Sequence, residues 1–251
     1  FSKSLENQNN WDSNEFTIEE ENIRAVLMPS QYSSGHSIND AVELAENLDI
    51  QYDIVPIKNI YKTYMKELKP LFGDLPFNVT EENIQARGRG MILMAMSNKF
   101  GNIVLNTSNK SEAAVGYGTL YGDMCGGLSV IGDLYKTEVF ELCRWINRRK
   151  EIIPNNTITK PPSAELRPNQ KDSDSLPDYD VLDEILFQYI EKTQGPNEII
   201  DMGFEPKLVR RILRLVNTNE FKRYQTAPVL RVSSKAFGMG RRMPIVGKYL
   251  S

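Results

Sequence analysis

The strongest constraint on the fold is an alternation of short apolar runs with longer amphipathic stretches over the first hundred residues. Strands that alternate with helices through short joints form right-handed crossovers and a parallel sheet. We therefore expect an α/β fold with a doubly wound parallel sheet. The predicted order is strand 23–28, helix 38–48, strand 52–56, helix 60–71, helix 83–96 and strand 101–106.

Beyond residue 133 the pattern becomes helical, with predicted helices at 136–149, 181–192, 197–202 and 206–216. A polar, proline-rich stretch, 154–177, lies between the first two of these helices. A loop of this length in a compact domain is either a functional lid or a mobile segment. Asp178 is placed to cap the helix that follows it. The sequence therefore predicts a helical C-terminal region.

The charge is unevenly distributed, because residues 221–251 contain seven basic and no acidic side chains, so that this tail carries +7 and the rest of the chain −10. The tail is either solvated or disordered, or it docks onto phosphate or an acidic neighbouring subunit. No recognition motif accompanies the charge, so we expect no nucleic-acid partner. The chain lacks a long apolar run or a signal-like start, and Cys125 and Cys143 lack paired spacing. We expect a cytoplasmic protein with no membrane partner.

Polar residues follow the apolar run 103–105, which we expect to be a buried strand. They form the run Thr107-Ser108-Asn109-Lys110-Ser111-Glu112, and a glycine-rich segment, 116–123, comes shortly afterwards. The carboxyl ends of parallel strands are where α/β proteins bind their ligands. A lysine, a carboxylate and several hydroxyls at such an end suit an anion that arrives with a metal ion. Nucleotide phosphate is the first candidate.

The predicted helix 83–96 carries a polar face and a pair of glycines. Asn83 and Arg87 are four residues apart and share one face, which is either a solvated surface or a ligand-binding surface. The opposite face is expected to pack through Ile84, Gly88, Met91 and Ala95. Because Gly88 and Gly90 weaken a helix, their presence indicates that a ligand or a partner helix approaches closely.

Five motif-like segments follow one another along the chain: Asn83-Ile84-Gln85-Ala86-Arg87-Gly88-Arg89, Thr107 to Glu112, Tyr117-Gly118-Thr119-Leu120-Tyr121-Gly122-Asp123, Lys160-Pro161-Pro162-Ser163-Ala164-Glu165-Leu166 and Lys235-Ala236-Phe237-Gly238. In this order they closely resemble the NAD synthetase family, and several spaced motifs are more specific than any one alone. The similarity runs from about residue 24 to residue 249 and is greatest to the synthetase domain of the glutamine-dependent, two-domain form. It implies an adenine-nucleotide-hydrolase-like domain over 23–251, with a basic tail, 221–251, after an atypical polar segment, 1–22.

The resemblance implies a ligase that forms a C–N bond. In this family the nicotinate carboxylate of deamido-NAD attacks the α-phosphate of ATP, which gives an adenylate and pyrophosphate, and ammonia then displaces AMP. The implied cofactors are ATP as co-substrate and Mg²⁺, and the implied assembly is a homodimer or larger homo-oligomer. Leu120 stands where ammonia-dependent members often carry lysine, which favours nitrogen from glutamine and an amidase domain, although free ammonia remains an alternative.

The resemblance also assigns roles to nine residues. Glu112 matches the acidic metal ligand, and Lys160 matches a lysine on the ATP phosphates; both are implied in catalysis. Thr107 and Ser163 join Lys160 in binding ATP. The residues implied in substrate binding are Asn83, Arg87, Glu112, Tyr117, Asp123 and Lys222.

Four of these residues have structural alternatives. Glu112 could be a carboxylate at a helix N-terminus that complements the helix dipole. Lys160 could be a solvated loop charge, Tyr117 a core residue, and Asp123 the cap of a turn beside Gly122.

One family feature is absent from the sequence. The phosphate loop, a Ser-Gly-Gly-x-Asp-Ser run that would end a first strand upstream of residue 23, does not occur, and Ser33-Ser34-Gly35 is a weak substitute. Either the sequence omits residues, or the protein is a degenerate copy. The alternative functions are therefore a non-catalytic dinucleotide-binding or assembly module, and another ligase of the same superfamily that adenylates a different carboxylate.

Overall fold

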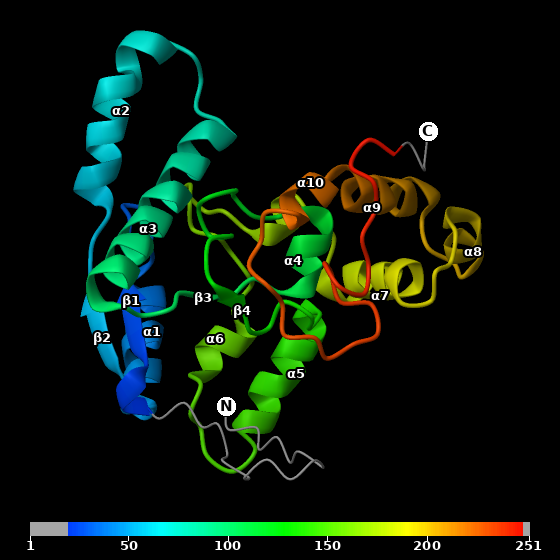
Figure 1. The fold of residues 1–251 in the computed structure, drawn as a ribbon, viewed down its shortest axis with the longest axis horizontal. Helices are drawn as coiled ribbons and strands as arrows, with labels where there is room; N and C mark the ends of the chain where they lie inside the picture. Colours follow the sequence, from blue (N-terminus) through cyan, green and yellow to red (C-terminus); the bar gives the residue numbers. More distant parts are fainter. Residues whose placement is uncertain (1–19, 248–251) are drawn as a thin grey trace.

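The computed structural model describes residues 20–247 and confirms the predicted alternation in the first half of the chain (Figure 1). The expected segment 1–22 lies almost wholly outside the described residues. Helix α3 begins four residues earlier and ends four residues later than predicted, because Asn78 forms a capping box at its start and Gly101, in the left-handed conformation, ends it. The elements are η1 (Glu20–Asn22), β1 (Arg24–Leu27), α1 (Gly35–Asn47), β2 (Gln51–Ile54), α2 (Lys58–Phe72) and α3 (Val79–Phe100).

The strands form two separate parallel pairs. Strand β1 pairs with β2, with Arg24 opposite Gln51, and β3 (Leu105–Asn106) pairs with β4 (Leu128–Ser129). Within residues 20–247 no strand ladder joins the two pairs, so the fold is α/β with small parallel sheets. The predicted burial of residues 103–105 is wrong: Ile103 is 64% exposed and Leu105 40% exposed. Strand β3 is limited to Leu105 and Asn106, so Ile103 lies in the segment before it.

The second half is helical, as predicted. Three short helices, α4, α6 and α10, were not among the predicted elements, although the structural alternative for Glu112 implied a helix start near α4. Asp178 holds the N-cap position of α7, but its side chain makes no capping hydrogen bond, so the capping prediction is wrong. The elements are α4 (Lys110–Val115), α5 (Lys136–Ile146), α6 (Asn155–Thr159), η2 (Asp172–Asp174), α7 (Tyr179–Ile190), α8 (Pro196–Asp201), α9 (Pro206–Thr218) and α10 (Glu220–Arg223).

The hydrophobic core lies in this helical half, where α4, α7, α8 and α9 meet (Figure 1). Its fully buried members include Ala114, Leu182, Ile185, Leu186, Ile199, Val209 and Leu213. In contrast, α2 contributes no buried residue. None of the helices in residues 20–247 is long and apolar enough to cross a membrane.

The basic tail packs against its own chain as far as it is described. Ser233 accepts a hydrogen bond from the buried ammonium of Lys110 at 2.9 Å and donates one to Asp133 at 2.9 Å. Farther along, Phe237 is buried among the core residues. Ser233 and Phe237 are therefore held by contacts within the chain, whereas Arg231 and Val232 between α10 and Ser233 are exposed.

Candidate active site

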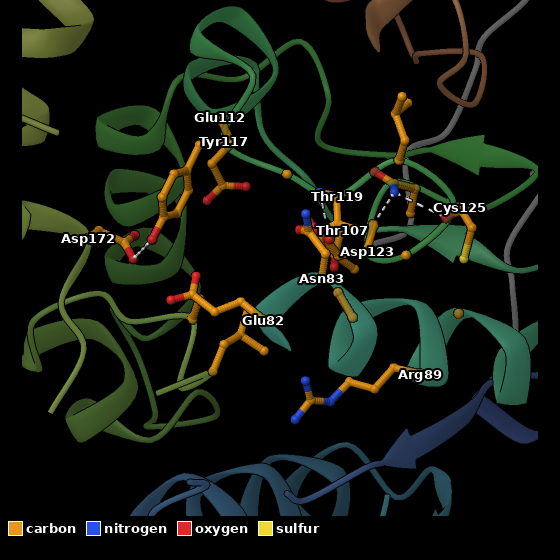
Figure 2. Close-up of a pocket in the computed structure, with 18 of the residues that line it drawn as sticks. Glu82, Asn83, Arg89, Thr107, Glu112, Tyr117, Thr119, Asp123, Cys125 and Asp172 are labelled. Carbon is orange, nitrogen blue, oxygen red and sulfur yellow. Dashed lines mark hydrogen bonds between the residues drawn. The ribbon is translucent and has the colours of Figure 1, made fainter. Parts of the chain in front are cut away.

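A cavity of about 790 Å³ opens between α3, α4, the glycine-rich segment 116–125 and the loop 160–172 (Figure 2). Residues far apart in the sequence meet on its walls because α3 and α4 approach it from different sides. All nine residues to which the family resemblance assigned roles line this cavity: Asn83, Arg87, Thr107, Glu112, Tyr117, Asp123, Lys160, Ser163 and Lys222.

Glu112 belongs to a capping box at the start of α4. Its backbone N–H donates to the side chain of Asn109 at 2.9 Å, and its carboxylate accepts from the Asn109 N–H at 3.4 Å. The other carboxylate oxygen lies 3.3 Å from the ammonium of Lys136. Burial raises the pKa of Glu112 by more than Lys136 and Asn109 lower it. Glu112 therefore does lie at a helix N-terminus, as its structural alternative stated. Its carboxylate also faces the cavity (Figure 2).

The donor set near Glu112 fits a metal ion shared with phosphate oxygens. Among the described residues, no three histidine, cysteine or acidic side chains gather closely enough to hold an ion by themselves. Mg²⁺ is commonly bound by one or two carboxylates together with substrate phosphates, and it keeps several waters. Glu112 could supply one such oxygen, while Lys136 now provides the positive charge beside it.

The glycine-rich segment approaches α3 backbone to backbone. A Cβ atom on Gly90 would lie 2.9 Å from the carbonyl oxygen of Tyr121, whereas one on Gly88 would meet nothing within 4 Å. The close approach predicted from the glycine pair is thus real at Gly90, and the neighbour is a loop of this chain. Thr119 donates to the side-chain oxygen of Asn83 at 2.7 Å and fixes this contact.

The packed face of α3 differs from the one predicted. Met91 is 65% exposed and Ala95 is also exposed. The buried side of the helix consists of Glu81, Gln85, Ala86, Gly88 and Gly90, because α3 packs against the loops 116–125 and 160–172.

Asp123 closes the turn of the glycine-rich segment. Its carboxylate accepts from the backbone N–H of Thr119 at 2.9 Å, which is the capping role stated as its alternative. Asp123 remains exposed at the cavity wall. The capping bond therefore sets the direction of the carboxylate without removing it from the cavity.

Tyr117 is held by a buried carboxylate. Its hydroxyl donates to Asp172 at 2.9 Å, and the hydroxyl of Tyr179 donates to the second oxygen of Asp172 at 2.9 Å (Figure 2). Burial, with a further contribution from Asp172, raises the pKa of the Tyr117 hydroxyl, so it stays protonated. The ring of Tyr117 is half-buried rather than a core residue, and it lines the cavity.

The loop 160–172 is docked onto α1. Lys160 donates to Ser37 at 3.1 Å and lies 3.2 Å from Asp40, so it is not a solvated loop charge. Glu165 accepts from the hydroxyl of Ser37 at 2.6 Å. The hydroxyl of Ser163 donates to the backbone within the loop. The proline-rich stretch 154–177, of which this loop is a part, also contains α6 and η2, so it is more ordered than its composition suggested.

Two further cations complete the walls. The ammonium of Lys222 donates to the carbonyl oxygens of Gly116 at 2.7 Å and Gly118 at 2.9 Å. Burial lowers the pKa of Lys222, and the charge of Asp123 opposes this shift only in part. Arg87 is exposed and donates from Nε to the carbonyl oxygen of Leu120 at 3.1 Å.

The polar lining residues that sequence reasoning missed include Arg89, Thr119, Lys136 and Asp172. Arg89 and Thr119 lie within segments that carry the family resemblance, so their place in those motifs was an available signal. The sequence carries no signal for Lys136 and Asp172, because only tertiary contacts bring them to Glu112 and Tyr117.

Comparison with known proteins identifies the family. The family model for NAD synthase matches residues 14–226. The chain belongs to this family. A glutamine-dependent NAD(+) synthetase from Synechocystis is 59% identical over 225 residues, which is 90% of this chain and 40% of that protein. The chain therefore spans about two fifths of the length of such curated relatives.

Solved structures agree with this membership. The glutamine-dependent NAD⁺ synthetase from Acinetobacter baumannii, in complex with ADP, is 47% identical over 88% of this chain and 40% of that chain, with a TM-score of 0.54. An NMN synthetase from Francisella tularensis is 28% identical over 79% of this chain and 75% of that chain, with a TM-score of 0.66. The fold of this chain, with its small parallel sheets and surrounding helices, is thus similar to the folds of these solved structures.

Proposed function

We propose that the chain is the catalytic part of an NAD synthetase that amidates deamido-NAD. In the first step an oxygen of the nicotinate carboxylate attacks the α-phosphorus of ATP, and the bond to pyrophosphate breaks. In the second step ammonia attacks the carbonyl carbon of the adenylate, AMP leaves, and one proton is released. The observation that carries the proposal is the meeting of all nine implied residues on one cavity.

The nucleotide side of the cavity would use Lys160, Thr107, Ser163 and Glu112. Lys160 would exchange its contact with Asp40 for the ATP phosphates, since the two bind the same ammonium. Glu112 would hold the Mg²⁺ that neutralises charge developing on pyrophosphate. Burial of the carboxylate strengthens this attraction, because a buried charge is poorly screened by water.

The dinucleotide side would use Asn83, Arg87, Tyr117, Asp123 and Lys222. Tyr117 can stack on the nicotinate ring, because Asp172 holds its hydroxyl and therefore its ring in one orientation. Asp123 would hydrogen-bond near the reacting end of the ligand. Lys222, which lacks a carboxylate partner among the described residues, would bind a ligand phosphate.

The test is product formation by the intact protein. With ATP, Mg²⁺, deamido-NAD and ammonium or glutamine, we expect AMP and NAD in equal amounts, measured by chromatography. AMP that forms without any dinucleotide would point to a ligase for another carboxylate. Dinucleotide binding with neither product would support a non-catalytic binding or assembly module.

A mononucleotide substrate is the second candidate, because the Francisella protein at 28% identity is described as an NMN synthetase. Nicotinate mononucleotide replaces deamido-NAD in a parallel assay. A larger kcat/KM for the mononucleotide would transfer the proposal to that substrate.

Glu112→Gln tests the nucleotide side. The substitution removes the charge and keeps the shape, so adenylation should fall about 100-fold or more while dinucleotide affinity changes little. Glu43→Gln on α1 is the control, since Glu43 is exposed and does not line the cavity. Unchanged turnover in Glu112→Gln would remove Glu112 from the metal site.

The nitrogen is proposed to come from glutamine, through an amidase domain, with free ammonia as the alternative. Leu120 lines the cavity at the position that favours the glutamine-dependent branch, and the Synechocystis relative is named glutamine-dependent. The measurement is the ratio of kcat/KM for glutamine to that for ammonium in the intact protein.

A homodimer or larger homo-oligomer is proposed, with the α2–α3 hairpin as the contact surface. This hairpin stands away from the rest of the molecule, and Leu71, Leu75 and Val79 near its end are 78%, 72% and 61% exposed (Figure 1). Exposed apolar patches commonly mark interfaces. Sedimentation should give at least a dimer, and Leu71→Arg should shift it toward monomer; a wild-type monomer would contradict this.

The organisation proposed for the chain is a synthetase domain over 23–251, with the basic tail 221–251, after an atypical polar segment, 1–22. We also propose that the two parallel pairs belong to one doubly wound sheet of the complete fold, since their strands share the parallel sense. Cytoplasmic location is proposed from the sequence.

A further inference from the structure

Arg89 occupies a distinct position at the cavity wall. It extends from α3 away from Asn83 and Thr119, as Figure 2 shows. Its Nε donates to the carbonyl oxygen of Met28, directly after β1, at 3.0 Å. Met28 and Lys160 both line the same cavity. The guanidinium is therefore fixed by one nitrogen beside the end of a strand.

Two of the other cations that line the cavity have carboxylate partners. Lys136 lies beside Glu112, and Lys160 lies beside Asp40. Within residues 20–247, no carboxylate oxygen comes within 4.0 Å of the Arg89 guanidinium. Burial lowers the pKa of Arg89, against the more distant charges of Glu165 and Asp123. A partly buried cation without an anion is costly, so this position favours an anionic ligand.

The geometry suits phosphate. With Nε fixed on Met28, the two terminal nitrogens of Arg89 remain for a ligand. A planar guanidinium binds phosphate oxygens through two parallel hydrogen bonds, which an ammonium cannot do.

Arg87 cannot take the same role. Residues two apart on a helix lie on nearly opposite sides of it, and Arg87 is bound to the carbonyl of Leu120 in the glycine-rich segment. The two arginines therefore serve different parts of the cavity, and Arg89 serves the part near β1 and the loop that carries Lys160.

We propose that Arg89 binds a phosphate group of the nucleoside triphosphate, with its Nε anchored on the Met28 carbonyl and its terminal nitrogens on phosphate oxygens. The inference rests on the proposed function, in which ATP lies on the Lys160 side. Phosphate groups are common to ATP and to the dinucleotide, so the two ligands are separated in the experiment.

The experiment is equilibrium titration of the intact protein with ATP alone and with deamido-NAD alone. Arg89→Gln should raise the Kd for ATP by about 10- to 100-fold, since hydrogen bonds to charged groups contribute about 1.5–3 kcal/mol and 1.4 kcal/mol is tenfold. The Kd for deamido-NAD should change less than twofold. Inorganic triphosphate should compete with ATP on the wild type and compete less well on the variant.

Two control variants distinguish a loss of phosphate binding from a general loss of structure. Arg89→Lys retains the charge but not the planar fork, so its affinity for ATP should lie between those of the wild type and Arg89→Gln. Lys66→Gln on α2 removes one positive charge at an exposed position away from the cavity and should leave both Kd values unchanged. Thermal unfolding of the free proteins should remain within a few degrees of the wild type.

Three results would overturn the inference. The first is an unchanged Kd for ATP in Arg89→Gln. The second is a loss of affinity for deamido-NAD alone, which would assign the phosphate to the dinucleotide. The third is an equal loss for both ligands together with a lower melting temperature in both Arg89 variants. In contrast, ATP binding that depends on Arg89 without formation of AMP or NAD would contradict the proposed function and support this inference.

Discussion

The two halves of the molecule bury apolar side chains very differently. In residues 20–103, only Ala45, Ile57 and Ala86 are buried apolar residues, and α2 has none. In the helical half, α7 and α9 each contribute four buried apolar residues to one cluster. The cavity walls around Tyr117 and Lys222 therefore adjoin a large apolar core, whereas those around Arg89 and Met28 belong to a half with few buried apolar side chains.

The largest effect expected from this difference is at Lys110. Its ammonium is fully buried with Asp133 at 2.8 Å, and Glu191 lies beside the same group. Lys110→Met leaves these carboxylates without their cation, so the free energy of unfolding should fall by about 3–5 kcal/mol in urea titration. The control is Lys66→Met on the exposed surface of α2, which should stay within about 0.5 kcal/mol. Equal losses of stability in Lys110→Met and Lys66→Met would mean that burial of the lysine does not determine its contribution to stability.

Truncation of a core side chain should cause the next largest loss in the free energy of unfolding. Leu213 on α9 is 0% exposed and Leu71 on α2 is 78% exposed. Leu213→Ala should cost about 3 kcal/mol through lost burial and a cavity. Leu71→Ala should cost less than about 0.5 kcal/mol at protein concentrations that keep the chain monomeric. A similar cost at both positions would show that the N-terminal half is packed as tightly as the other.

Alanine substitutions at the two glycines of α3 should change the free energy of unfolding in opposite directions. Gly90→Ala forces a Cβ to 2.9 Å from a backbone oxygen, so it should lower the free energy of unfolding by about 1–3 kcal/mol. Gly88→Ala meets nothing within 4 Å and should raise it by about 0.5–1 kcal/mol. Chemical denaturation of both variants measures the difference, and destabilisation by Gly88→Ala would contradict it.

The smallest effect concerns two carboxylates with lowered pKa values. Burial alone would raise the pKa of Asp133, but Lys110 and the N–H groups of Ser233 and Val232 outweigh it. The hydrogen bond from Arg24 lowers the pKa of Asp53. Each group therefore contributes stability that is present above the usual aspartate pKa and is lost as the pH falls through the lowered value.

Salt should separate these two contributions. The Arg24–Asp53 pair is partly exposed, so 0.5 M NaCl should weaken its part of the pH dependence, while the buried Asp133 part should persist. Stability measured against pH for Asp53→Asn and Asp133→Asn, at low and high salt, makes the test. An Asp133 contribution that disappears in salt would contradict the burial argument.

The sequence predicted the elements with long periodic patterns. It did not predict side-chain exposure and capping, which depend on tertiary contacts. Strands β1 and β2 and the longer helices were predicted because their apolar spacing is regular. The exposure of Ile103 could not be predicted, since it depends on which distant elements pack over the segment before β3. The capping role of Asp178 failed because a favourable residue type does not fix where its side chain points.

The site followed the same rule. Asn83, Glu112 and Lys160 could be predicted through their motifs, and the structure brings them to one cavity. The partner of Tyr117 could not, because Asp172 is 55 residues away and lies in a segment without a recognisable pattern. Arg89 was within reach of sequence reasoning, but only the structure distinguishes it from Arg87, because Arg89 is partly buried and bound to Met28, whereas Arg87 is exposed and bound to Leu120.

Arg223 gives the site an order of assembly during synthesis. Its guanidinium donates to the carbonyls of Ala114 at 2.7 Å and Val216, so one side chain satisfies the ends of both α4 and α9. Helix α4 has six residues, too few to be stable alone. A nascent chain must therefore extend 109 residues beyond Ala114 before Arg223 can join the two helix ends. At about 5–20 residues per second, this bond to the helix that carries Glu112 stays unmade for roughly 5–20 seconds after the residues of α4 are made.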